Sequence, residues 1–214
     1  MHIAIVTTSF PDDAFQPGQE AAGAFVTDFA AALASHVQTT VIAPGKQKTI
    51  QHLENYKVHR FAVPSLPLSL LKPSKPVSWP RILQTLRAGQ MAVRQVAQNE
   101  NPDHLFALWA LPSGYWARKT SVPYSIWALG SDIWDLGRIP IIKNILSSVL
   151  RDSQHRYADG FLLSDDVQHI SQMDCHFLPS TRKLNQAVQK TLATQPPYKL
   201  AFLGRWHVNK GIDL

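Results

Sequence analysis

Apolar and polar residues follow two different spacings along the chain, and these spacings predict strands that alternate with helices. Short apolar runs rich in β-branched residues indicate strands, whereas apolar residues that recur every three or four positions indicate helices. We predict strands at residues 2–8, 39–45, 57–63, 103–110, 122–129, 160–164, 175–179 and 199–204. We predict helices at residues 24–34, 80–100, 113–120 and 141–150.

The same spacing indicates which side of each long helix is buried. In the second helix the expected core stripe consists of Ile82, Leu83, Leu86, Val93, Val96 and Ala97. Strands that alternate with helices form right-handed βαβ units. The predicted fold class is therefore α/β, a Rossmann-like parallel sheet with helices on both faces. Ligands of such sheets bind beyond the carboxyl ends of the strands, so the loops there are the first place to look for a site.

Composition and charge narrow the class of protein. Apolar residues make up 45% of the chain, which fits a globular domain, and the net charge of +6 favours anionic partners. No dense basic run or aromatic RNA-binding signature is present, so we expect no nucleic acid partner. The single cysteine, Cys175, fits a reducing compartment and is interpreted as a buried thiol.

Several motifs of other enzyme classes are missing from the sequence. There is no Gly-x-Gly-x-x-Gly, which argues against a dehydrogenase, and no Gly-x-Ser-x-Gly, which argues against a serine hydrolase. Without Asp-x-Asp or His-x-x-x-His, we expect no metal and no cofactor. The adjacent acids Asp165 and Asp166 are interpreted as solvated residues at a helix start.

Five segments, in their order along the chain, resemble the family-4 glycosyltransferases of the GT-B fold. They are Gly23–Ala34, Asp103–Gly114 (DHLFALWALPSG), Pro123–Ile133 (PYSIWALGSDI), Ala158–Ser164 and Phe202–Asp213 (FLGRWHVNKGID). The resemblance implies two facing Rossmann-like domains with a cleft between them. By this comparison, residues 1–194 are the acceptor-side domain, and residues 195–214 are a linker and the first strand of an incomplete donor-side domain.

The resemblance also implies an activity. It implies a retaining, metal-independent enzyme that transfers a sugar from a nucleotide-sugar donor to a glycan or lipid-linked acceptor. Because the later part of the family pattern lies beyond residue 214, a non-catalytic acceptor-binding or interaction domain is the alternative. Neither the sugar, the nucleotide nor the acceptor follows from the sequence.

Donor binding is assigned by the resemblance to Arg205, Lys210 and Gly23. A leaving nucleoside diphosphate gains negative charge, which fixed cations stabilise in the transition state. Glycine before a helix lets an anion approach backbone N–H groups. The structural alternatives are two solvated surface cations and a glycine needed only for its turn.

The acceptor side of the cleft is assigned by the resemblance to Gly130, Ser131, Asp132, Ser164 and Trp109. Structural interpretations stay open: Ser131 or Asp132 would cap the following segment, Ser164 would cap a helix, and Trp109 would fill the core. Where the family usually has a cleft histidine, this sequence has Leu129, and the histidine often found in the fourth strand falls at Leu108. We therefore name no catalytic residue.

Residues 66–79 mix leucine, valine and tryptophan with Lys72 and Lys75, and Arg81 and Arg87 follow. Basic residues beside apolar ones suit an anionic membrane surface, and an ordinary solvated loop is the alternative. The chain start lacks a basic leader, and no apolar run reaches the length of a membrane span. We therefore expect a cytoplasmic protein, with peripheral contact at the inner membrane face as a second expectation.

Overall fold

The computed structural model describes residues 1–11, 23–64, 76–180 and 197. The following description concerns the compact unit Met1–Arg182. Its strands are β1 (His2–Val6), β2 (Gln38–Gly45), β3 (Thr49–His52), β4 (Lys57–Ala62), β5 (His104–Leu108), β6 (Tyr124–Ala128), β7 (Arg156–Ala158) and β8 (His176–Phe177). Its longer helices are α1 (Ala24–Ala34), α2 (Trp79–Glu100), α5 (Pro140–Asp152) and α6 (Phe161–Ser171). Shorter turns of helix are η3 (Pro76–Ser78), η4 (Ala110–Gly114), α3 (Tyr115–Arg118), α4 (Ser131–Trp134) and η5 (Leu136–Arg138).

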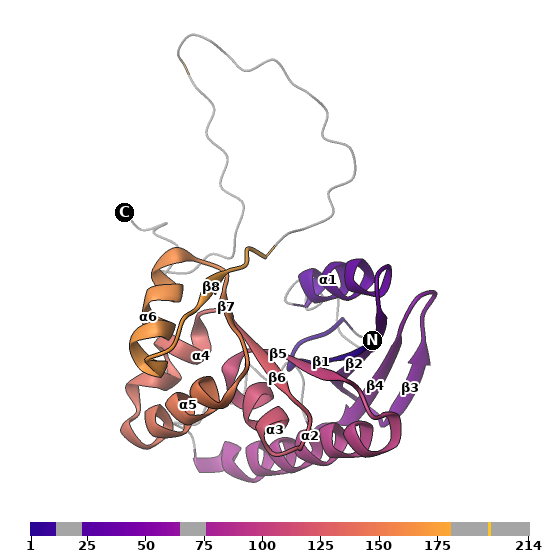
Figure 1. The fold of residues 1–214 in the computed structure, drawn as a ribbon. Coiled ribbons are helices and arrows are strands. Elements are labelled where there is room, and N and C mark those ends of the chain that lie inside the picture. Colours follow the sequence, from indigo (N-terminus) through magenta and orange to yellow (C-terminus); the bar gives the residue numbers. More distant parts are fainter. Residues whose placement is uncertain (12–22, 65–75, 181–196, 198–214) are drawn as a thin grey trace. The chain divides into compact units, whose positions relative to one another are not determined.

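The strands form one sheet in the order β3-β4-β2-β1-β5-β6-β7-β8 (Figure 1). All neighbouring strands are parallel except β3, which runs antiparallel to β4 with Thr49 opposite Arg60. The predicted α/β fold class is confirmed. β1 lies between β2 and β5, so the chain reverses its direction of travel across the sheet at β1.

Two apolar clusters bury the two faces of the sheet. One face is covered by α1, whose Val26 and Ala30 pack with Trp127 and Leu108. The other face is covered by α2, α3, α5 and α6, which contribute Val93, Val96, Trp116, Leu146, Val149, Leu163 and Val167. Trp127 is 1% exposed. Cys175, directly before β8, is buried, as the sequence predicts.

One sequence prediction of secondary structure is wrong, and one strand is missed. The sequence predicts a strand at residues 160–164, but Phe161–Ser164 begin helix α6, and the strand is the preceding Arg156–Ala158. Strand β3 is not predicted by the sequence pattern. The helix α2 forms as expected, but its predicted core residues Leu83 and Leu86 are 50% and 36% exposed.

The guanidinium of Arg156 explains how a charged residue fits into strand β7. Its Nη1 donates to the carbonyl oxygens of Leu150 and Ser153, at 3.0 and 2.7 Å, and its Nε donates to Asp174 O at 2.8 Å. Arg156 is 6% exposed. A cation therefore closes the C-terminal end of α5, where free carbonyl groups and the helix dipole favour it.

At the opposite edge of the sheet, Glu100 joins the end of α2 to several strands. Its carboxylate lies 2.8 Å from Lys57 Nζ and 2.7 Å from His59 Nε2, and it accepts a hydrogen bond from Thr40 Oγ1 at 3.1 Å. Burial opposes its ionisation, but the hydrogen bonds from Lys57 and Thr40 and the nearby His59 hold the pKa of Glu100 below its usual value. The network fixes α2 against β2 and β4.

Gly89 allows α2 to pack closely on α3. A Cβ atom at position 89 would lie 2.5 Å from Cη2 and 2.7 Å from Cε2 of Trp116, which is 1% exposed. We expect Gly89→Ala to lower the free energy of unfolding by about 2 kcal/mol, because overpacking outweighs the gain in helix propensity. Urea unfolding measures the change.

Gly160→Ala is the matched control, because a Cβ there meets no heavy atom within 4 Å. The added methyl group would contact the Trp116 indole. Trp116→Phe puts a smaller ring at this position, so it should partly restore stability to the Gly89→Ala variant. A Gly89→Ala protein as stable as the wild type would contradict the packing described.

Candidate functional site

The carboxyl ends of the parallel strands gather the loops in which the sequence predicts a site. Gly23 follows the loop after β1, Trp109 follows β5, Gly130 follows β6, and the first turns of α6 follow β7. From β1 the strands that follow in the chain (β2 to β4) lie on one side of it, and β5 to β8 lie on the other side. The carboxyl ends of β1 and β5 therefore form the topological switch point of the sheet. The predicted acceptor-side residues therefore share one edge of the sheet.

Gly23 is buried where the loop after β1 packs against the start of α1. A Cβ there would lie 2.9 Å from both the backbone N and the Cα of Phe10. The Gly23 carbonyl accepts the N–H of Val26 at 3.0 Å, which starts the helix. This close backbone approach gives the glycine a structural purpose, independent of any anion.

Trp109 holds an unusual backbone conformation at the carboxyl end of β5. Its φ is +69°, in the region that residues other than glycine seldom adopt. Hydrogen bonds on both sides fix it: Trp109 N donates to Trp127 O at 2.9 Å, and Gly114 N donates to Trp109 O at 3.2 Å. The indole meets Phe25 edge-on, with ring centroids 6.1 Å apart. Strain of this kind often marks functional loops.

Asp132 links the loops after β5 and β6. Its Oδ2 accepts the N–H of Ala110 at 2.6 Å, and the residue is 2% exposed. Burial raises the pKa of Asp132 to about 6, although backbone N–H groups, including that of Ala110, act to lower it. The N-cap residue of α4 is Gly130, so neither Ser131 nor Asp132 occupies the N-cap position.

Gly130 and Trp134 shape the turn that carries Asp132. Gly130 has φ +104°, and a Cβ there would lie 3.1 Å from the Trp134 ring. The Trp134 indole N–H donates to Asp166 Oδ2 at 2.7 Å. Asp166 is thus held by α4, and the described residues contain no cluster of three acidic, histidine or cysteine side chains that could hold a metal.

Ser164 and the two leucines at the usual histidine positions have structural contacts. Ser164 lies in α6, is 6% exposed and donates its hydroxyl to Cys175 O at 3.0 Å. Leu108 is fully buried, and Leu129 packs against the same apolar cluster as Trp109. The predicted diphosphate ligands Arg205 and Lys210 lie outside the described residues.

An exposed aromatic pair at this edge is not predicted by the sequence pattern. Phe161 and Phe177 stack with ring centroids 4.3 Å apart, and they are 73% and 44% exposed. The run of apolar residues from Phe161 to Leu163 is the available signal, but its spacing indicates a buried strand as readily as a helix.

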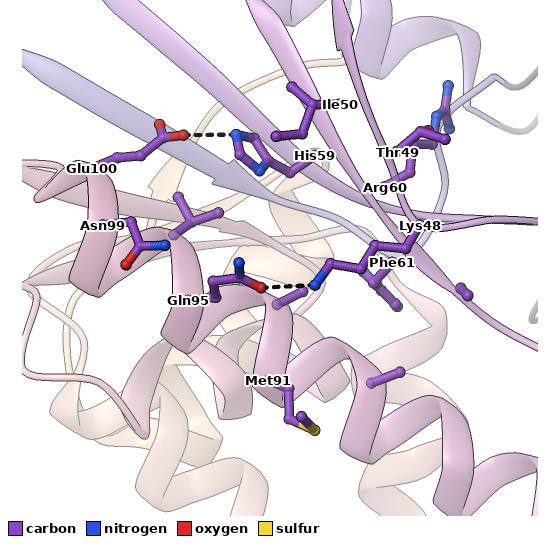
Figure 2. A pocket seen from close by; sticks show the side chains of 14 residues that line it. Lys48, Thr49, Ile50, His59, Arg60, Phe61, Met91, Gln95, Asn99 and Glu100 are labelled. Carbon is purple, nitrogen blue, oxygen red and sulfur yellow. Dashed lines mark hydrogen bonds and ion pairs between the residues drawn. The ribbon is translucent and has the colours of Figure 1, made fainter.

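A groove of about 760 Å³ lies elsewhere, between α2 and the β3–β4 pair (Figure 2). Figure 2 shows Lys48 pointing to Gln95 and His59 pointing to Glu100, with 3.1 Å between Lys48 Nζ and Gln95 Oε1. Burial, together with the nearby Lys57, lowers the pKa of His59, although the Glu100 carboxylate acts to raise it. These polar groups pair with one another, so the strand-end loops, not the groove, are the candidate site.

Comparison with solved structures supports the same architecture. A sucrose-phosphate synthase structure from Thermosynechococcus elongatus is similar at a TM-score of 0.58 and 12% identity, over 84% of this chain and 88% of that one. An α,α-trehalose-phosphate synthase (UDP-forming) from Burkholderia vietnamiensis is similar at a TM-score of 0.52 and 10% identity, over 83% and 48% of the two chains. A UGT from Arabidopsis thaliana complexed with UDP is similar at a TM-score of 0.53 and 13% identity, over 85% and 52%.

These similarities concern the fold. No family model matches the sequence, and no curated protein matches it. The chain spans about half the length of the trehalose-phosphate synthase and UGT structures. The described part of this chain has the Rossmann-like α/β fold found in GT-B glycosyltransferases.

Proposed function

We propose that this chain is the acceptor-side part of a family-4-like glycosyltransferase that takes a sugar from a nucleotide-sugar donor. The observation that carries the proposal is the contact between the loops that follow β5 and β6, beside the switch point of a sheet with this fold. There Asp132 accepts the N–H of Ala110, and Trp109 holds a strained backbone conformation. Such an edge is where α/β sheets bind ligands. The similar structures named as synthases and as a UDP complex are consistent with a sugar-nucleotide donor.

In the proposed chemistry, the nucleotide-sugar donor binds to residues near position 214. Arg205 and Lys210 would bind the diphosphate and stabilise the charge that develops as the glycosidic bond breaks. Arginine offers paired N–H donors to phosphate oxygens, and lysine a compact charge. The absence of Asp-x-Asp from the sequence favours a mechanism in which these cations take the place of a metal ion. Retention of anomeric configuration belongs to this proposal.

The acceptor would lie along the strand-end loops. Trp109 offers an aromatic face, and Gly130, Ser131 and Ser164 lie on the loops or first helical turns that follow β6 and β7. A glycan or a lipid-linked sugar is the proposed acceptor class, because hydroxyl-rich rings stack on aromatic faces while their hydroxyl groups bind backbone and side-chain polar groups.

Titration calorimetry with UDP, GDP and ADP tests the donor assignment on the protein that contains this chain. We expect Arg205→Ala/Lys210→Ala to weaken binding of the preferred diphosphate at least tenfold, since two charge-assisted contacts are lost. The matched control is Lys143→Ala/Arg151→Ala, which removes two exposed cations from α5. Equal affinities for the wild type and the Arg205→Ala/Lys210→Ala protein would refute the assigned roles. Acceptor binding without any diphosphate binding would favour the non-catalytic alternative.

A further inference from the structure

The N-terminal half of α2 presents apolar side chains to solvent. Trp79, Leu83 and Leu86 follow one another at spacings of four and three residues, so they lie along one side of the helix. They are 56%, 50% and 36% exposed, and Val77 in the preceding turn η3 is 88% exposed. The helix is held to the sheet mainly through its later residues Val93 and Val96, which are buried. Contiguous exposed apolar side chains of this size mark interaction surfaces.

Before its last residue, Glu100, the charged residues of the same helix are all basic. Between residues 76 and 99 there are three arginines, Arg81, Arg87 and Arg94, and no acidic residue; Glu100 is the first. Arg87 lies one turn beyond Leu83, and Arg94 lies two turns beyond Arg87. Leu83, Arg87 and Arg94 therefore share a side of the helix. Arg87 and Arg94 are both exposed. The partner of this surface must therefore accept apolar side chains and carry negative charge.

We propose that this surface, made of Val77, Trp79, Leu83, Leu86, Arg87 and Arg94, docks the protein on an anionic membrane. Apolar side chains enter the boundary between head groups and acyl chains, while long arginine side chains reach the lipid phosphates. Each basic residue near such a surface strengthens binding about fivefold. No described helix is long and apolar enough to cross a bilayer, so the contact is peripheral.

A second copy of the chain is a poorer partner for this surface. Two copies joined through it would bring arginines against arginines with no acidic residue of residues 76–99 to neutralise them. Like charges that face one another across an interface are unfavourable. An anionic bilayer satisfies both the charge and the apolar side chains. The inference does not depend on the proposed sugar transfer.

Vesicle flotation with the full chain tests the proposal. We expect binding to vesicles of phosphatidylglycerol and phosphatidylcholine, much weaker binding to phosphatidylcholine alone, and release as the salt concentration rises. Arg87→Gln/Arg94→Gln should weaken binding about 25-fold, at about fivefold per charge. Leu83→Gln should also weaken it about fivefold, because less apolar surface is buried.

The controls separate this surface from the general charge of the protein. Arg118→Gln/Arg151→Gln removes the same net charge from α3 and α5, and Ile141→Gln removes a 77% exposed apolar side chain from α5. Both controls should bind vesicles as the wild type does, and circular dichroism should show every variant folded. Three results would each overturn the proposal. The first is an equal loss of vesicle binding in the two arginine double variants, and the second is no binding of the wild type to anionic vesicles. The third is a change of oligomeric state in Leu83→Gln in a protein that does not bind vesicles. Diphosphate titration is a separate measurement, so failure here leaves the proposed function standing, and the reverse is also true.

Discussion

Replacing Arg156 with methionine should lower the free energy of unfolding by about 4 kcal/mol. The substitution keeps much of the side-chain volume but removes every donor, and the carbonyl oxygens of Leu150, Ser153 and Asp174 lose this partner inside the protein. A buried polar group without a partner costs about 1–3 kcal/mol. The loss also withdraws a cation from the end of α5. For a chain of this size the expected fall in Tm is about 10 °C.

Two further variants show whether the hydrogen bonds are the cause. Arg151→Met removes an exposed arginine from the same helix and should change stability by less than about 0.5 kcal/mol. Arg156→Lys keeps the charge but cannot reach three carbonyl groups at once, so its stability should fall between those of the wild type and Arg156→Met. If thermal unfolding gave the same Tm for Arg156→Met and Arg151→Met, the proposed role of Arg156 would be wrong.

Asp132→Asn should change how stability depends on pH, by about 2 kcal/mol between pH 4 and pH 7. The pKa of Asp132 is about 6 in the folded protein, and an aspartate in an unfolded chain titrates near ~4. Between these values the folded state holds more protons than the unfolded state, so wild-type stability falls as the pH rises. Asparagine has no proton to lose, and its side-chain oxygen can still accept the Ala110 N–H. The free energy of unfolding of Asp132→Asn, relative to that of the wild type, should therefore increase as the pH rises.

Urea unfolding from pH 4 to pH 7 measures this difference directly. Subtracting the wild-type curve from that of the variant cancels every other titrating group that the two share. Asp135→Asn is the matched control, because Asp135 is an exposed aspartate three residues away. If the difference curve for Asp132→Asn does not vary between pH 4 and pH 7, burial does not perturb this carboxyl.

The alternation of strands and helices could be predicted because most elements bury one face with clear periodicity. The errors lie where local pattern and tertiary contacts disagree. Phe161–Leu163 form a short apolar run, which periodicity alone cannot assign to strand or helix. Strand β7 is hidden because its first residue is Arg156, whose charge is stabilised by carbonyl groups from residues on other elements. Leu83 and Leu86 fit a core pattern, but η3 and the start of α2 extend beyond the part of the helix that packs on the sheet.

The sequence indicates a place in the fold for the candidate site, but not the burial, hydrogen bonds or backbone conformation of its residues. The turn residues that follow the strands, including Gly130 and Asp132, indicate the edge of the sheet at which the candidate site is placed. Aspartate is rarely buried, and the N–H group that it accepts comes from Ala110, on a loop after another strand. The left-handed backbone of Trp109 likewise depends on hydrogen bonds to Trp127 and Gly114, which no local pattern reveals. The resemblance to family-4 glycosyltransferases located these residues, and the structure adds the contacts that hold them.

The two outer strands of the sheet have a consequence for how the protein behaves at high concentration. A parallel sheet that ended in a long apolar strand would offer a row of free backbone groups to other chains. Among the described residues one border of the sheet is β3, four residues long, antiparallel and mostly polar, and the other is β8, two residues long. Strand-by-strand growth into aggregates therefore has little template at either border. In the described part of the chain, the short outer strands limit such growth in a sheet that stays open.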